Sequence, residues 1–135
     1  MKKPRVILRN CSAYQVDEIS TIIRESISDL DCQIKGKVFV KPNVVTAHKR
    51  YIRDSYTNPA VVEAAVQVLK EFDPHRITVG ESGGYGTPSR MFFKEAGYYE
   101  MAKRAGVDLI DLNEHALVKV PLEKGVWHKD IMLSK

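Results

Sequence analysis

The stretch Ile-Thr-Val-Gly-Glu-Ser-Gly-Gly-Tyr-Gly at residues 77–86 decides the fold of this chain. It begins with a β-branched apolar run, reaches an acidic residue and a hydroxyl, and then has three glycines among four residues. This order is typical of a β-strand that ends in a glycine-rich turn. Thr87-Pro88 follows with the pattern of a helix start, a capping hydroxyl and then proline.

Strand and helix patterns alternate outward from this stretch in both directions. Apolar residues at helical spacing mark the helices, and short continuous apolar runs mark strands that are buried on both faces. The predicted order is a strand at 5–9, a helix at 16–30, a strand at 37–41, a helix at 59–73, a strand at 76–80, helices at 88–96 and 98–105, a strand at 107–112, and strands at 117–122 and 130–133. The connection at 43–58 is long for a compact domain, and such loops are usually functional or mobile.

Two further helix starts carry capping patterns. Ser12 and Gln15 fit a capping box, in which a hydroxyl and a glutamine three residues later satisfy free helix amides. Asn58-Pro59 combines a capping side chain with proline at the first helical position.

The alternation of units predicts the α/β class with a single domain over residues 1–135. We expect a mostly parallel sheet with helices on both faces, a Rossmann-like three-layer arrangement, followed by a C-terminal β-hairpin. The last predicted strand is apolar and stands two residues from the C-terminus. This position indicates either a truncated domain or a strand that another chain completes.

Composition narrows the functional classes. The 135 residues carry a formal net charge of +4, which fits either an ordinary solvated surface or an anionic partner. The absence of a run of five like charges and of an RNA-binding motif argues against nucleic acid. The apolar run after the basic N-terminus is too short for a signal peptide or membrane span, so we expect a cytoplasmic protein.

Neither of the two cysteines, Cys11 and Cys32, has a partner at the spacing of a zinc or iron–sulfur site. The four histidines also lack metal-ligand spacing. We therefore predict no metal site in this chain. Two cysteines without a signal peptide favour free thiols in a reducing compartment, and a structural disulfide between them is the alternative.

Polar residues follow three of the predicted parallel strands and should meet at one edge of the sheet. An anionic small molecule would be held there by the charge of Lys41, by helix-terminal amides and by the glycine-rich turn. Glu81 is the candidate acid–base group and Ser82 the second catalytic candidate. The candidate ligand-binding residues are Lys41, Asn43, Thr57, Gly83, Gly84, Gly86 and Asp111.

Simpler interpretations stay open for the same residues. The glycines fit a tight turn that needs positive φ, Asp111 fits a local turn cap, and Lys41 fits a surface lysine. The third glycine of a dinucleotide fingerprint is missing, and no phosphate loop is present. The pattern Gly-x-Ser-x-Gly around Ser82 matches a nucleophile elbow, with Asp111 and a later histidine (His115 or His128) as its partners.

Four segments together resemble the family catalogued as domain of unknown function 362. They are Lys41-Pro42-Asn43, Thr57-Asn58-Pro59, Gly80-Glu81-Ser82 and the phrase Ala-Gly-Val-Asp-Leu-Ile-Asp-Leu at 105–112, and the resemblance runs from about Val6 to the end. It implies an α/β domain, prokaryotic and often archaeal occurrence, and no assigned activity. It also implies that some relatives carry ferredoxin-like cysteine motifs, which this chain lacks, and that the family domain continues past the position of Lys135.

Two functions are expected from these observations. The first is a small-molecule site for an anion at the sheet edge, with the reaction and any enzymatic activity left open. The second is a non-catalytic module that self-associates as a homo-oligomer, or completes a partner subunit, through its C-terminal strand; a ferredoxin-like partner is one form of this idea.

Overall fold

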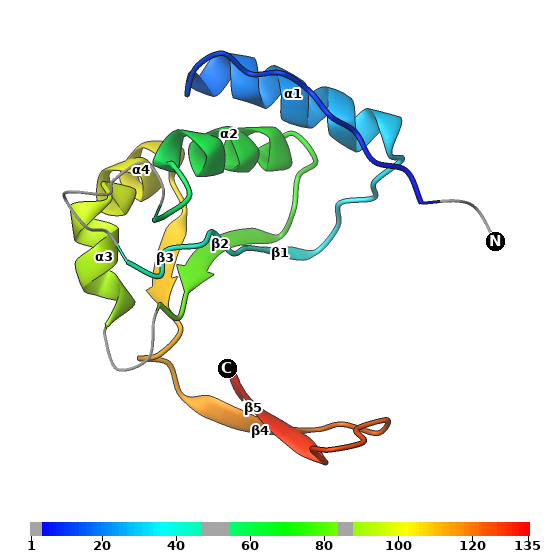
Figure 1. The fold of residues 1–135 in the computed structure, drawn as a ribbon, viewed down its shortest axis with the longest axis vertical. Helices are drawn as coiled ribbons and strands as arrows, with labels where there is room; N and C mark the ends of the chain where they lie inside the picture. Colours follow the sequence, from blue (N-terminus) through cyan, green and yellow to red (C-terminus); the bar gives the residue numbers. More distant parts are fainter. Residues whose placement is uncertain (1–3, 47–54, 84–87) are drawn as a thin grey trace.

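The computed structural model of the chain describes residues 4–46, 55–83 and 88–135. Four helices and five strands follow one another as α1 (Val16–Asp29), β1 (Lys37–Val40), α2 (Pro59–Lys70), β2 (Arg76–Glu81), α3 (Ser89–Glu95), α4 (Tyr98–Ala105), β3 (Asp108–Asp111), β4 (Leu117–Pro121) and β5 (Asp130–Ser134) (Figure 1). The predicted alternation of strands and helices between residues 37 and 112 is therefore confirmed.

The first three strands form a parallel sheet in the order β1-β2-β3, so β2 is central. Val40 lies opposite Val79, and Val79 lies opposite Leu109, which places a row of branched apolar side chains across the sheet. This register also brings the carboxyl ends of β1, β2 and β3 to one edge, as expected for parallel strands joined by helical connections.

The main core lies between this sheet and α2, α3 and α4. Alternate strand residues face these helices, because successive side chains point to opposite faces of a strand. The buried cluster comprises Val44, Val62, Val66, Ile77, Val79, Phe93, Ala96, Tyr98, Met101 and Ala105, with Val38, Val40 and Leu109 packed against it. The α/β class, the parallel sheet and the C-terminal hairpin are thus confirmed.

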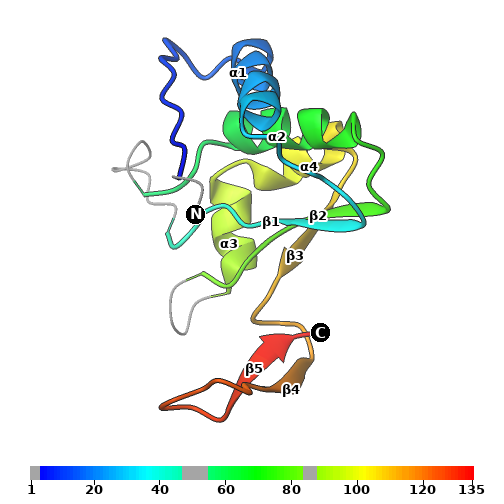
Figure 2. The same cartoon turned by 90° about the vertical axis from the view of Figure 1, so that its right-hand side faces the viewer.

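The helices differ from the three-layer expectation in one respect. Helix α1 packs on the outer side of α2, and the ribbon views place both helices on the same side of the sheet (Figures 1 and 2). The opposite face carries Phe39, Thr78 and Ile110, and Phe39 is 47% exposed. Within the described residues, a helical layer on that face is not observed.

Gly80 belongs to this second face and has a packing role. A Cβ atom at this position would lie 2.7 Å from Cγ1 of Ile110 and 3.0 Å from the ring of Phe39. The side chains of both edge strands therefore lean over the central strand, and only glycine leaves room for them there.

The strand predicted at residues 5–9 is wrong. Residues 4–10 have no regular secondary structure, and Val6 and Leu8 are 83% and 87% exposed. The segment lies along α1, where Arg9 contacts acidic residues of the helix, and Arg5 binds Asp31, which follows the end of α1, at 3.1 Å. A three-residue apolar run makes a strand only where a neighbouring strand pairs with it, and no strand of the described residues does so.

The helix starts agree with the sequence to different degrees. Asn58 caps α2 as predicted, since its Oδ1 accepts the amide of Ala60 at 2.9 Å and proline is the first helical residue. The capping box at α1 is wrong, because Gln15 is the N-cap and makes no capping bond, while Ser12 contacts Glu18 instead. Pro88 is the N-cap of α3 rather than its first residue, and Thr87 lies outside the described residues.

Strands β4 and β5 form a separate antiparallel hairpin with Leu117 opposite Ser134 and Pro121 opposite Asp130. The hairpin projects from the side of the sheet opposite α1 and α2 (Figure 1). Within the described part of the chain, these two strands pair only with each other.

Candidate functional site

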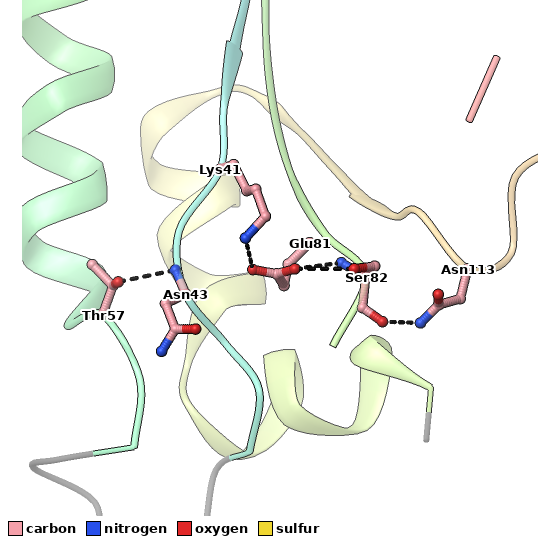
Figure 3. Close-up of polar contacts among 6 residues, drawn as sticks. All are labelled: Lys41, Asn43, Thr57, Glu81, Ser82 and Asn113. Carbon is pink, nitrogen blue, oxygen red and sulfur yellow. Dashed lines mark hydrogen bonds and ion pairs between the residues drawn. The ribbon is translucent and has the colours of Figure 1, made fainter. Parts of the chain in front are cut away.

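Lys41 and Glu81 meet at the carboxyl ends of β1 and β2. Lys41 directly follows β1, Glu81 is the last residue of β2, and Nζ of Lys41 lies 2.6 Å from Oε2 of Glu81 (Figure 3). The glutamate is buried with 3% of its surface exposed, whereas 55% of the lysine side chain is exposed. The ion pair therefore joins a buried carboxylate to an ammonium group that still reaches solvent.

The second oxygen of Glu81 is held by Ser82. Its Oε1 accepts the Ser82 amide at 2.7 Å and the Ser82 hydroxyl at 3.3 Å. Burial of Glu81 acts to raise its pKa, but hydrogen bonds from Lys41 and Ser82 together outweigh it, so the pKa lies below its usual range. The carboxylate is therefore ionised at neutral pH, the state that a general base requires.

Asp111 ends β3 and lies next to Glu81 in the sheet register. Its two oxygens accept the backbone amides of Arg90, at 3.1 Å, and Asn113, at 3.0 Å. The bond to the Asn113 amide is the local turn cap that the simpler interpretation of Asp111 predicted, whereas the bond to the Arg90 amide joins β3 to α3. One amide in the first turn of α3 is therefore already bound by a carboxylate of the chain itself.

Asn43 and Thr57 hold each other across the base of the long connection. The Thr57 amide donates to the Asn43 carbonyl at 2.8 Å, and the Asn43 amide donates to the Thr57 hydroxyl at 3.1 Å. Val44 and Tyr56 form the next bridge. Thr57 is therefore occupied in closing this base, whereas the side chain of Asn43 points away from it and is exposed (Figure 3).

Tyr98 is part of the same arrangement, and nothing in the sequence pattern identified it. Its hydroxyl donates to the Thr57 carbonyl at 2.7 Å, and the residue is fully buried at the start of α4. Burial raises the pKa of Tyr98 above its ordinary value, with further contributions from Tyr56 and Glu81, so the phenol stays protonated and remains a donor. An aromatic residue after a glycine is no signal for such a role, because the contact depends on tertiary packing.

The structure describes only one of the three glycines that were predicted to bind a ligand. Gly83 has φ of +63°, the conformation that a tight turn demands and that glycine adopts without strain. Gly84 and Gly86 lie outside the described residues, so the predicted cradle for an anion stays a prediction. Asn113, which follows β3, donates from its side chain to the Ser82 carbonyl (Figure 3).

The nucleophile-elbow interpretation gains no support from the geometry. The Ser82 hydroxyl contacts Glu81, and both oxygens of Asp111 hold backbone amides. Among the described residues, neither His115 nor His128 forms a hydrogen bond with Ser82. A serine needs a base within hydrogen-bond reach, and here its neighbour is an ion-paired glutamate.

Two other kinds of feature, a metal centre and a membrane-spanning helix, are not observed among the described residues. No group of three or more histidine, cysteine, aspartate and glutamate side chains is arranged to hold a metal ion there. Cys11 and Cys32 are free and exposed. None of the described helices has the length and apolar character needed to cross a lipid bilayer.

Comparison with known proteins yields one match. A family model described as "Domain of unknown function (DUF362)" matches residues 38–135, which include the sheet, α2 to α4 and the hairpin. The match begins in β1, so the N-terminal segment and α1, which the resemblance was expected to include, lie outside it. No curated protein and no solved structure matches the chain.

Proposed function

The chain belongs to the DUF362 family, a domain of unknown function, and from its own geometry we propose that it binds a small anionic molecule at the carboxyl ends of β1 and β2. The observation that carries this proposal is the Lys41–Glu81 pair, in which a buried carboxylate fixes a half-exposed ammonium group at a strand end. Ligands of parallel α/β sheets bind at this edge.

The local charges indicate which part of a ligand this site would hold. An ammonium group has three donors, and only one is needed for Glu81, so Lys41 retains donors for an anion on its exposed side. The exposed side-chain amide of Asn43 would supply a donor and an acceptor beside it. Because the charge of Glu81 offsets that of Lys41, we expect modest affinity and a small polar ligand with one anionic group.

The proposal names a binding site and leaves the reaction open. Glu81 would act as a base only if a ligand displaced Lys41 or Ser82 from its oxygens, since both oxygens are now engaged. The exposed free cysteines support placing this binding in a reducing compartment, consistent with the cytoplasm.

Thermal unfolding in the presence of inorganic phosphate, pyrophosphate and oxalate, against sodium chloride at matched ionic strength, tests the site. A ligand at about ten times its Kd should stabilise the protein by about 1.4 kcal/mol. Lys41→Met should remove this stabilisation, and Lys94→Met, which changes an exposed lysine at the end of α3, should retain it. Equal stabilisation of both variants, or none of the wild type by any probe, would contradict the proposal.

A second candidate function is self-association through the C-terminal hairpin. A two-stranded hairpin is marginally stable in water, and this one exposes large apolar side chains, including Ile131, Leu133 and Trp127 at 44%, 46% and 92%. Light scattering over a range of protein concentrations tests it. A mass of one chain at every concentration would exclude association.

A further inference from the structure

Strand β5 has one edge that its partner does not use. The amide of Leu122 donates to the Lys129 carbonyl at 2.9 Å, and the amide of Lys135 donates to the Ala116 carbonyl at 2.8 Å. Backbone groups in an antiparallel ladder alternate in direction, so odd-numbered residues of β5 point toward β4. The backbone groups of Asp130, Met132 and Ser134 therefore point away from it.

The two outer edges of the hairpin are not equivalent. Strand β4 contains Lys119 and Pro121, residue types that discourage further strand pairing at an edge. Strand β5 reads Asp-Ile-Met-Leu-Ser and contains neither proline nor lysine. The edge of β5 is thus the one that is open to another strand.

One face of the hairpin is also apolar without a covering layer. The register places Val118 beside Leu133 and Val120 beside Ile131, and these four side chains share a face. Val118, Ile131 and Leu133 are each more than one third exposed. If further strands of the same pattern were added to the sheet, this apolar face would become wider, and its side chains would cover one another from solvent.

We propose that β5 pairs antiparallel with β5 of a second copy about a two-fold axis at Met132, forming a four-stranded sheet in the order β4-β5-β5-β4. This inference rests on the second candidate function and specifies its interface. The register uses all of β5, with Met132 opposite the second copy's Met132, Ile131 opposite its Leu133, and Asp130 opposite its Ser134. The residues with outward backbone groups fall opposite one another, so each such pair exchanges two hydrogen bonds.

The sequence of β5 is complementary to itself in this register. Within residues 130–134 apolar residues meet apolar residues, and directly outside β5 the same register sets Lys129 opposite the second copy's Lys135. Each Asp130 falls opposite the second copy's Ser134, a polar residue without a charge. Self-complementarity of this kind, required at a two-fold axis, is the reason for choosing a second copy as the occupant.

A crosslinking experiment tests the register directly. In a background with Cys11→Ser and Cys32→Ser, Met132→Cys should give a covalent dimer with a short bis-maleimide reagent, because the two positions meet at the axis. Lys119→Cys is the matched control, since Lys119 lies opposite Met132 on the same face but in β4. This variant should give no covalent dimer, because two strands would separate the two copies of this position in the paired molecules.

A second variant tests the edge without a new cysteine. Met132→Pro removes an outward amide and leaves the β4 ladder intact, so light scattering should show one chain, while Met132→Leu should remain dimeric. Wild-type protein that is monomeric at every concentration overturns this inference and the second candidate function together. A dimer that survives Met132→Pro, or crosslinks equally through Lys119→Cys, overturns the register alone, and anion binding at Lys41 stays independent of both outcomes.

Discussion

Glu81 and Asp111 lie directly opposite each other at the ends of β2 and β3, and both carboxylates are buried. Opposite residues on neighbouring strands share a face, so two acids stand side by side on the helix-covered side of the sheet. The two carboxylates differ in their hydrogen-bond partners, and we expect them to have different roles. Glu81 binds the half-exposed ammonium group of Lys41, whereas Asp111 binds two backbone amides.

The coupling between Lys41 and Glu81 is measurable by a double-mutant cycle. Lys41→Met leaves a buried carboxylate without its cation and should lower the free energy of unfolding by ~1–2 kcal/mol. This loss is smaller than the one expected for a fully buried ion pair, because the lysine is half-exposed and solvent screens its charge. Glu81→Gln should weaken the same contact. Urea denaturation of the single and double variants should give a coupling of about 1 kcal/mol, and strict additivity would contradict the pairing.

The low pKa of Glu81 predicts a specific dependence of stability on pH. The ordinary value for this carboxyl is 4.5, and the folded value is lower, so the unfolded chain takes up the proton first as the pH falls. The stabilisation is complete above about pH 6 and is lost as the pH falls below 4.5 and through the folded pKa. The stability difference between wild type and Glu81→Gln should therefore shrink over this range, and a difference that stays constant would refute the assignment.

Asp111 should behave as a structural cap. Asp111→Ala removes the acceptor for the Arg90 and Asn113 amides and should destabilise the fold by ~1–3 kcal/mol. Asp111→Asn keeps one oxygen and should cost less. Thermal denaturation gives the ranking, and equal stability of Asp111→Ala and the wild type would show that water replaces the carboxylate at no cost.

Gly80→Ala tests the packing on the second face of the sheet. The new methyl group would meet Ile110 and Phe39 at distances that force a side chain to move, so we expect a loss of ~1–3 kcal/mol. Ile110→Ala opens space at the closest contact. The double variant should therefore be more stable than the sum of the single changes predicts, and additivity would show that the contact with Ile110 is not the cause.

Tyr98→Phe tests the closure at the base of the long connection. Without the hydroxyl of the buried Tyr98, the carbonyl of Thr57 loses a 2.7 Å hydrogen bond, and we expect a loss of ~1–2 kcal/mol in the free energy of unfolding. The Thr57 amide, which donates to Asn43, should then exchange with solvent faster than in the wild type. Tyr99→Phe, on the neighbouring and more exposed ring, should leave that exchange rate unchanged.

Local signals predicted much of the fold because they agree with its tertiary contacts. The apolar runs of β1 and β2 and the Asn58 cap act within a few residues, and parallel pairing alone brings Lys41 near Glu81. The strand expected at residues 5–9 failed because pairing depends on a distant neighbour. The Tyr98–Thr57 contact was unpredictable for the same reason, since it joins residues far apart in the sequence.

The central position of β2 has a consequence for the order in which the chain opens. Backbone amides of β2 lie between two neighbouring strands and beneath the main cluster of buried side chains, whereas β1 and β3 each pair with one strand among the described residues. Local opening begins where contacts are fewest, so protons on the outer strands and the hairpin should be replaced by deuterium first. The backbone amide protons of residues 77–80 should be the last to exchange. The strand that leads to Glu81 is therefore expected to have the lowest hydrogen-exchange rates in the molecule.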